Sequence, residues 1–365
     1  MFWLQHCVVF SCKIHQDYKS ENYEGILKEI EDMKFVKNRD RAYARTITFG
    51  FGSLVEIIYD IIWAYHKDNL DIYLESRRYY DLLSEYVSNE ELWVLSLNHD
   101  LILESLCLDF NIPLTFGSTE KNVFPQNNMN MKKSMNFQQV HRRNISLKHM
   151  DFFENTRGIN LIKLHGALNE YSYDNSEKIV HIEPTNDDTS ASYLKKTENV
   201  LKKAHFFLDD KPVQIQNEIP ISDFDGNMQF FRKSLLTGGY KYSETFNKKP
   251  GEEKIHLAEE VLREVDELTI IGYGFGDNHI NQRLYNAMLL NEDMSITIVD
   301  PFMKNIPEIL RPFNYNRRVR KVTSRFPEWL VYLKYGKWDS TYFKQLNEIR
   351  RNVSAMNTDI VGKYL

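Results

Sequence analysis

Asn98 and Asp100 are the first residues in this sequence whose types and spacing suit ligand chemistry. They follow a continuous apolar run, residues 92–97, that is too short for a helix, and apolar residues resume at helical spacing from Leu101. This pattern predicts a buried strand, a tight polar loop and a helix. Because ligands of open α/β sheets bind outside the carboxyl ends of the strands, an amide and a carboxylate placed there are candidate site residues.

Three later segments repeat this order of apolar run and polar turn. One run ends in His165, whose imidazole could accept a proton near neutral pH. Another ends in a Gly-x-Gly-x-Gly-Asp segment, residues 272–277, whose backbone amides could approach a phosphate. The last ends in Asp300, a carboxylate that could bind ribose hydroxyls from a strand terminus. Together the four segments favour a nucleotide ligand.

Each of these features also has an ordinary structural explanation. Asn98 could cap the following helix, and Asp100 could lie in the first turn of that helix. His165 could be a loop histidine with its hydrogen bonds satisfied, and the glycine-rich segment could be a simple turn. Asp300 precedes Pro301 and could be a turn residue. The nucleotide hypothesis therefore depends on the joint pattern.

Helices that would position these loops can also be predicted. Residues 1–48 are expected to be mostly helical, and Ser53 could cap an amphipathic helix over 54–65. A further helix is expected over 74–86. A helix at 255–265 leads directly into the third apolar run, which repeats the order of a parallel α/β fold.

The segment 122–143 is rich in Asn, Gln, Met and Lys and has neither helical nor strand periodicity. We interpret it as a long loop, which in a compact domain is usually functional or mobile.

Composition narrows the class of protein. The chain has 365 residues, 42% hydrophobic content and a formal net charge of −5, which predicts a soluble globular protein. No global charge points to nucleic acid or to an anionic membrane. Local basic clusters at 142–143 and 317–321 leave nucleic-acid binding open, although a solvated charged face is the favoured explanation.

The number and spacing of the cysteines indicate the cellular compartment and whether a structural metal is expected. Cys7, Cys12 and Cys107 form no Cys-x-x-Cys pair, so we expect neither a disulfide framework nor a structural zinc site. No metal is expected. Residues 1–10 are apolar but lack a preceding basic region, and the helix over 54–65 is too short to span a bilayer. These features predict a cytoplasmic protein without a membrane segment.

The four segments, taken in order, resemble the sirtuin-like domain of bacterial anti-phage defence proteins. The segments that carry the resemblance are 96–104, 163–166, 271–281 and 298–301. It implies an α/β fold in which a Rossmann-like parallel sheet, flanked by helices, binds NAD beside a smaller helical module. It also implies hydrolysis of NAD to nicotinamide and an ADP-ribose product on infection.

The resemblance further implies roles for individual residues. Asn98 would hold the nicotinamide ribose or the attacking water, Asp100 would contact the carboxamide, and His165 would be the general base. Because cleavage develops an oxocarbenium-like ribose, the site needs fixed dipoles more than a strong nucleophile. Residues expected to line the phosphates and adenosine are Gly272, Gly274, Phe275, Asp277 and Asp300.

Two departures from the family pattern qualify these expectations. The four-cysteine zinc ribbon of protein-deacylating sirtuins is missing, which argues against a protein deacylase. The Gly-Ala-Gly-x-Ser loop that grips the pyrophosphate is also missing, and residues 49–53 are the only similarity to it. We therefore expect that the chain lacks the front of the domain. The alternative hypothesis is a catalytically weak subunit that binds NAD or ADP-ribose, or a structural subunit.

The resemblance also suggests partners and a division of the chain. Such domains act as homo-oligomers or with a defence partner, and a HerA-type ATPase is preferred over an Argonaute-like protein. We expect an N-terminal helical segment over 1–89, the sirtuin-like domain with helical and loop insertions over 90–302, and a C-terminal helical extension over 303–365.

Overall fold

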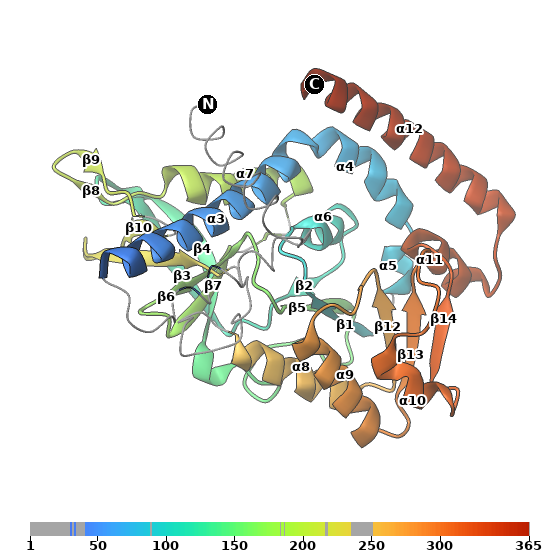
Figure 1. Ribbon diagram of the computed structural model, residues 1–365. Helices are drawn as coiled ribbons and strands as arrows, with labels where there is room; N and C mark the ends of the chain where they lie inside the picture. The colour runs from blue at the N-terminus through green and yellow to red at the C-terminus, as the bar shows by residue number, and fades with distance from the viewer. Residues whose placement is uncertain are drawn as a thin grey trace.

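The computed structural model has a mixed α/β fold (Figure 1). Its strands form two three-stranded parallel sheets, a six-stranded antiparallel sheet and a two-stranded ribbon within the part of the chain that is described. The described residues are 30, 33, 41–87, 90–182, 184–185, 187–215, 218–234 and 251–364.

The first parallel sheet has the strand order β1-β5-β2. Its strands are β1 (Glu91–Ser96), β5 (Gly158–Lys163) and β2 (Leu114–Thr115). The register pairs Ser96 with Lys163 at the carboxyl ends of β1 and β5. The polar loop after β1 and the histidine after β5 therefore lie at the same edge of this sheet, as the sequence predicted.

The second parallel sheet has the strand order β12-β13-β14. Its strands are β12 (Glu267–Ile271), β13 (Ser295–Val299) and β14 (Val319–Val322). The register pairs Ile271 with Val299, so the glycine-rich turn and Asp300 leave adjacent strands at the same edge. β14 lies in the range that we expected to be a helical extension. Only Val319 of this strand is buried, and its charged neighbours hide the strand pattern.

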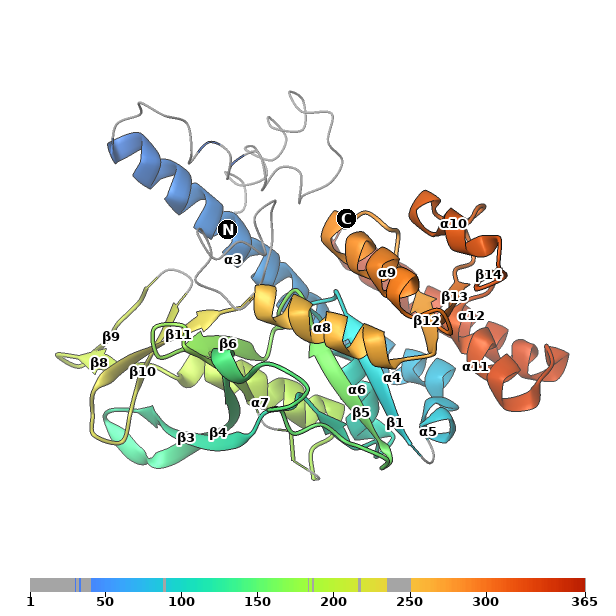
Figure 2. The same cartoon turned by 90° about the horizontal axis from the view of Figure 1, so that it is seen from below.

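The two parallel sheets lie side by side, with β1 next to β12 (Figures 1 and 2). Leu95 of β1 packs against the apolar clusters of both sheets. Val265 and Ile280 also pack against both clusters. Backbone hydrogen bonds join the strands within each sheet rather than across this boundary. Side-chain packing therefore holds the two halves together.

β5 is buried at all six positions because helices cover both of its faces. Ile159 and Leu161 face one apolar cluster, shared with helices α6, α11 and α12. Ile162 faces the opposite cluster, to which α8 contributes Ala258. This alternation follows from the two-residue period of a strand. The helices are α6 (Ile102–Asp109), α8 (Glu252–Glu264), α9 (Asn278–Leu290), α11 (Phe326–Tyr335) and α12 (Ser340–Tyr364).

The antiparallel sheet has the strand order β10-β11-β6-β7-β4-β3. Its strands are β3 (Glu120–Asn127), β4 (Asn130–His141), β6 (Glu170–Tyr173), β7 (Lys178–Ile182), β10 (Glu218–Ser222) and β11 (Met228–Lys233). Its core is aromatic, since Phe231 packs against Phe124, Phe137 and Tyr171 at ring-centroid distances of 5.0–5.7 Å. Helices α3 (Arg41–Asp68) and α7 (Ser190–Lys203) add residues to this core.

The interpretation of 122–143 as a long loop is wrong, because these residues form most of the β3-β4 hairpin. A register shift between Pro125 and Asn127 interrupts the alternation, and many of the polar positions are solvent-exposed. Phe124 and Phe137 are buried only because distant strands supply their partners. The antiparallel sheet, which the sequence did not predict, is thus the main element beside the parallel sheets.

Two helix predictions also need correction. α3 runs without a break from Arg41 to Asp68, so Ser53 lies inside a helix and does not cap one. The segment 49–53 is therefore helical and does not form a phosphate-binding turn. The single helix expected over 74–86 is divided into α4 (Leu70–Ser76), η1 (Arg77–Tyr80) and α5 (Leu83–Tyr86). Residues 1–29, 31–32, 34–40 and 88–89 of the N-terminal helical prediction lie outside the described residues.

The remaining short elements connect these layers. They are η2 (Arg142–Asn144), β8 (Phe207–Leu208), β9 (Lys211–Pro212), η3 (Glu308–Leu310) and α10 (Arg311–Asn314).

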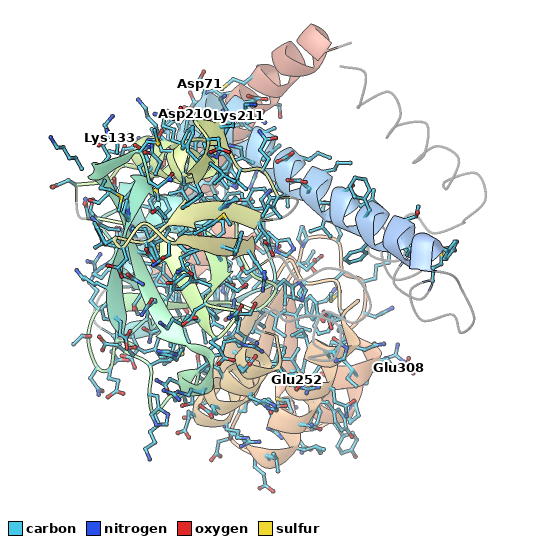
Figure 3. The ribbon with its side chains drawn as sticks, turned by 90° about the vertical axis from the view of Figure 1, so that its left-hand side faces the viewer. Asp71, Lys133, Asp210, Lys211, Glu252 and Glu308 are labelled. Atoms are coloured by element: carbon cyan, nitrogen blue, oxygen red, sulfur yellow. The ribbon has the colours of Figure 1, made fainter. Side chains whose placement is uncertain are left out.

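Figure 3 shows Lys133, Asp210 and Lys211 on the antiparallel part, while Glu252 and Glu308 lie at the other end of the view. None of the described helices is both long enough and apolar enough to cross a bilayer.

The hairpin gives a direct test of this fold. Phe137→Ala should lower the free energy of unfolding by about 3–5 kcal/mol, because it leaves a cavity in a fully buried aromatic cluster. Met129→Ala, in the exposed hairpin turn, is the control and should change it by less than about 0.5 kcal/mol. Chemical denaturation measures both. Equal, small effects would contradict the burial of β4.

Candidate functional site

His165 and Asp277 meet where the carboxyl ends of the two parallel sheets come together. The imidazole Nε2 lies 3.2 Å from Oδ2 of the carboxylate, and the side chains are only 7% and 8% exposed. The other carboxylate oxygen, Oδ1, accepts hydrogen bonds from the amides of His279 and Ile280 at the start of α9. Asp277 therefore caps a helix with one oxygen and places the other within ion-pair distance of an imidazole. This is the arrangement in which an acid can stabilise a histidine that accepts a proton.

His99, which was not among the predicted site residues, lies beside this pair. Its ring centroid is 6.0 Å from that of His165, and its Nδ1 is 3.2 Å from the carbonyl oxygen of Gly166. The pKa of His99 is lowered to about 4, mainly by burial and next by the neighbouring His165, while the hydrogen bond to Gly166 opposes both effects. His99 is therefore neutral near pH 7. Its position in the sequence, between the predicted site residues Asn98 and Asp100, could have identified it as a candidate.

Gly166 is required by the backbone that carries His165. Its φ is +78°, and a Cβ atom at this position would lie 2.1 Å from the backbone oxygen of Ser234. Positive φ and this close approach both exclude a side chain. Ser234 directly follows β11, so the antiparallel sheet presses against the loop that holds the histidine.

Asn98 and Asp100 have different surroundings in the loop after β1. Asn98 is exposed, and its backbone amide donates to Oγ of Ser96 at 3.2 Å. Asp100 accepts a hydrogen bond from the amide of Ile102 through Oδ1 at 3.0 Å. Asp100, and not Asn98, therefore accepts a hydrogen bond from a backbone N–H group in the first turn of α6. The exposed amide of Asn98 lies at the same sheet edge as His165.

The glycine-rich turn leaves an open surface above the end of β12. Gly272 needs its glycine because φ is +64°. Gly274 and Gly276 have no positive φ, and no heavy atom of the described residues lies within 4 Å of a Cβ built on either. The side-chain amide of Asn281 donates a hydrogen bond through Nδ2 to the carbonyl oxygen of Phe275 at 2.9 Å and fixes the turn. A fixed turn with bare backbone suits the close approach of a phosphate.

Asp300 is placed as predicted but makes an ordinary turn. Its Oδ1 accepts hydrogen bonds from the amides of Phe302 and Met303 at 2.7 and 2.6 Å. It leaves β13 beside the end of β12, one strand away from Gly272. The structure thus brings His165 and Asp277 into contact and arranges the other predicted residues along the same pair of edges.

A buried ionic chain, which was not predicted from the sequence, supports this edge. Lys254 Nζ lies 2.6 Å from both carboxylate oxygens of Glu170 and donates to the carbonyl of Lys163 at 2.9 Å. His181 Nε2 lies 2.9 Å from Glu170 Oε2. Burial alone would raise the pKa of Glu170, but Lys254 and His181 outweigh it and lower the pKa to about 2. The lysine therefore fixes the backbone two residues before His165.

Lys163 makes a second buried connection at the same edge. Its Nζ donates to the carbonyl of Asp100 at 2.6 Å and lies 3.4 Å from Oε2 of Glu104. Both side chains are buried, and burial raises the pKa of Glu104 while Lys163 opposes the shift. Lys163 thus ties the loop after β1 to β5. A lysine inside an otherwise apolar run was the signal that could have found this network.

The basic cluster at 317–321 is engaged in the fold. Arg318 donates to the carbonyl of Met294, and Arg320 donates to Oγ1 of Thr297. Lys321 donates to carbonyls of the loop after β13. These contacts give the cluster a structural explanation.

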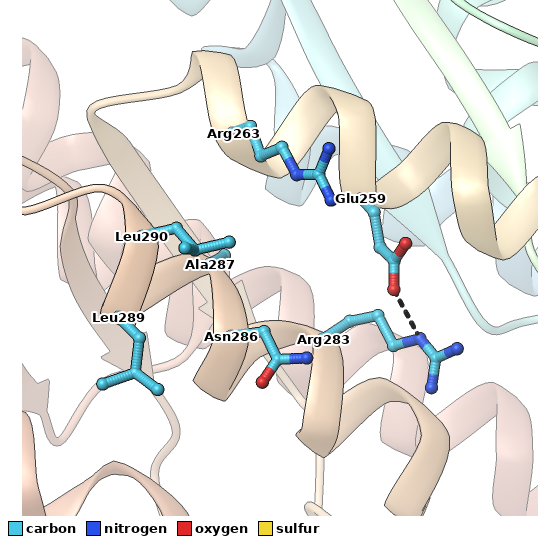
Figure 4. Close-up of a pocket in the computed structure, with 7 residues that line it drawn as sticks. All are labelled: Glu259, Arg263, Arg283, Asn286, Ala287, Leu289 and Leu290. Atoms are coloured by element: carbon cyan, nitrogen blue, oxygen red, sulfur yellow. Dashed lines mark ion pairs between the residues drawn. The ribbon is translucent and has the colours of Figure 1, made fainter.

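One surface pocket, of about 180 Å³, lies between α8 and α9 (Figure 4). An ion pair of 2.9 Å between Glu259 and Arg283 crosses it. The predicted site residues do not line this pocket. The residues that line it are Glu259, Arg263, Arg283, Asn286, Ala287, Leu289 and Leu290.

Comparison with known proteins adds no assignment. No protein-family model matches the sequence, and no curated protein matches it. The described residues contain no group of three or more His, Cys, Asp or Glu side chains placed to hold a metal ion. The resemblance based on the four segments therefore stays a prediction.

Gly166 offers a first test of the site's architecture. Gly166→Ala should lower the free energy of unfolding by about 2 kcal/mol or more, because the methyl group meets the Ser234 carbonyl at a positive φ. Gly274→Ala, with open space around it, should stay within about 0.5 kcal/mol of the parent. Thermal or chemical unfolding compares them. A tolerated Gly166→Ala would mean that β11 does not press on this loop.

The ionic chain offers a second test. Lys254→Met should lower the free energy of unfolding by about 3–5 kcal/mol, because it leaves the Glu170 carboxylate buried without its main partner. The double variant Lys254→Met/Glu170→Gln should recover most of this loss. If the double variant is no more stable than the single one, packing of the lysine stem, and not charge, is responsible.

The same pair predicts a pH dependence. The pKa of Glu170 is lower in the folded state, about 2, than its ordinary value of 4.5, so the unfolded state binds more protons between these values. Its contribution to stability is complete above pH 4.5 and is lost as the pH falls towards 2. Unfolding followed over this range should show a weaker dependence in Glu170→Gln than in the parent.

Proposed function

We propose that the protein is an NAD glycohydrolase that cleaves NAD to nicotinamide and ADP-ribose as an effector of bacterial anti-phage defence. The observation that carries the proposal is the contact between His165 and Asp277 at the meeting of two parallel-strand edges. An exposed amide, Asn98, and an open glycine turn lie along the same edges. The defence context comes from the resemblance alone.

The geometry suits a proton acceptor next to a glycosidic bond. An imidazole can take a proton from water or from a ribose hydroxyl at neutral pH. The Asp277 carboxylate, 3.2 Å away, would stabilise the imidazolium that forms. Because Asp277 is itself held by the amides at the start of α9, its position needs no rearrangement during the reaction.

The glycine turn suits the pyrophosphate of the same ligand. Gly274 and Gly276 carry no side chain into the open space above β12. Their backbone would let phosphate oxygens approach amide groups closely. Asp300, one strand further along the edge, lies where a carboxylate could bind adenosine ribose hydroxyls. In this arrangement NAD would extend from the His165 loop along the ends of β12 and β13.

A second function, binding without turnover, is favoured by a different observation. Residues 49–53, the only similarity to the family's phosphate-gripping loop, lie inside the continuous helix α3. This segment therefore does not supply that loop. The protein would then be a weakly catalytic NAD- or ADP-ribose-binding subunit, or a structural subunit, in a homo-oligomer or a complex with a HerA-type ATPase. The two functions differ in turnover.

Nicotinamide release from NAD by the purified protein tests the proposal. His165→Ala and Asn98→Ala should each lower kcat by roughly 100-fold or more, because each removes a group that acts on the reacting ribose or water. His256→Ala is a matched control, since this histidine lies on α8 with a 63% exposed side chain, and it should leave turnover unchanged. Turnover that survives both site substitutions would rule out this assignment. Binding without turnover would favour the second function.

A further inference from the structure

His99 carries a hydrogen-bonding atom that the fold does not use. The residue is 6% exposed, and its Nδ1 is 3.2 Å from the carbonyl oxygen of Gly166. Its other nitrogen, Nε2, is buried and has no hydrogen-bond partner among the residues that the structure describes. Buried polar atoms are nearly always satisfied, so an unsatisfied one beside a candidate site calls for a physical explanation.

The hydrogen bond to Gly166 decides which kind of group Nε2 is. A carbonyl oxygen can only accept, so Nδ1 must donate and carry the proton. Because the pKa of His99 is lowered to about 4, mainly by burial, the ring holds a single proton near neutral pH. Nε2 is therefore a bare acceptor. It is suited to a hydroxyl or an amide N–H, and it repels an anionic oxygen.

The ring of His99 lies beside His165, at the end of the site where the proposed reaction would take place. The centroid of His99 lies 6.0 Å from that of His165, and the two residues follow the adjacent parallel strands β1 and β5. The neighbouring backbone is fixed, since Lys163 holds the carbonyl of Asp100. Both histidines thus lie at one sheet edge and differ in their partners, since His165 lies 3.2 Å from a carboxylate oxygen and His99 lies 3.2 Å from a backbone carbonyl oxygen.

We propose that His99 is a ligand-recognition residue whose Nε2 accepts a hydrogen bond from a hydroxyl or amide N–H of the ligand bound at His165. The inference rests on the proposed function, in which NAD offers two donors of this chemistry at its reacting end. They are the nicotinamide carboxamide N–H and the hydroxyls of the adjoining ribose. An uncharged acceptor recognises either donor without adding charge to the site where a positive ribose develops.

Two substitutions separate recognition from a purely structural role. An Asn side chain can place its amide N–H near the position of Nδ1, so His99→Asn retains the hydrogen bond to Gly166 and removes the second acceptor. A Gln side chain can place its amide oxygen near the position of Nε2, so His99→Gln retains an acceptor towards the ligand and loses the bond to Gly166. Thermal unfolding without ligand reports the first role, and kcat/KM for nicotinamide release reports the second.

The proposal expects opposite outcomes for the two variants. His99→Asn should unfold close to the parent temperature yet lose roughly tenfold in kcat/KM, because a ligand donor loses its partner in a buried site. His99→Gln should unfold at a lower temperature yet retain more activity per folded molecule than His99→Asn. A folded His99→Asn with parental kcat/KM would overturn the proposal, and so would a His99→Gln that is the less active of the two per folded molecule.

A substrate comparison identifies the donor. Nicotinic acid adenine dinucleotide replaces the carboxamide of NAD with a carboxylate, which offers no N–H. If the donor is the carboxamide, His99→Asn should reduce the preference for NAD over this analogue. If the donor is a ribose hydroxyl, His99→Asn should lower kcat/KM equally on both. Either result supports recognition by His99, whereas no effect on either substrate overturns it.

Failure of this inference can be told from failure of the proposed function. A parent protein that neither binds nor cleaves NAD, by calorimetry and nicotinamide release, overturns the proposed function and this inference with it. A parent that cleaves NAD in a manner dependent on His165, but equally well with Asn at position 99, overturns only the inference.

Discussion

Two buried lysines hold the strand ends on which the candidate site depends. Lys254 and Lys163 each place an ammonium group against a backbone carbonyl at the carboxyl edge of the first parallel sheet. A buried ammonium group is tolerated only when carboxylates and carbonyls replace its water, and Glu170 and Glu104 supply the carboxylates. Because the acceptors include the backbone, the charges fix the path of the chain just before His165. The precision of the site is thus a consequence of paired charge in the interior.

The antiparallel sheet helps to hold the carboxyl edge of the first parallel sheet, where His165 lies. β6 carries Glu170 and β7 carries His181, so the ionic chain begins in that sheet and ends on β5. The residue after β11, Ser234, lies so close to Gly166 that no side chain fits there. Together, these contacts make the loop that bears the histidine part of the boundary between the two kinds of sheet. Changes in the aromatic core of the antiparallel part should therefore be transmitted to the site.

The two halves of the parallel region contribute different chemistry. The loops after β1 and β5 provide side chains, namely an exposed amide and two histidines with different hydrogen-bonding states. The loop after β12 provides backbone amide groups, because Gly274 and Gly276 have no side chain to cover them. Asp277 joins the halves by capping α9 and contacting His165 with separate oxygens. A ligand with a reacting sugar at one end and phosphates further along matches this division, which is the physical basis for proposing NAD.

The sequence by itself determined the strands of the parallel region and the loops that follow them. Continuous apolar runs mark strands of the core, and parallel strands bring their following loops to one edge, so β1, β5, β12 and β13 could be located from the sequence. Their burial differs from the prediction, since β5 is buried at every position whereas β1 is only partly buried and β12 is exposed at both ends. Only the tertiary structure decided the β3-β4 hairpin, the ionic chain and the unused acceptor of His99. Phe137, for example, becomes a core residue only when Phe231, distant in the sequence, packs against it. Likewise Lys254 is stable in the interior only because Glu170 reaches it from another sheet, and no local pattern encodes such a meeting.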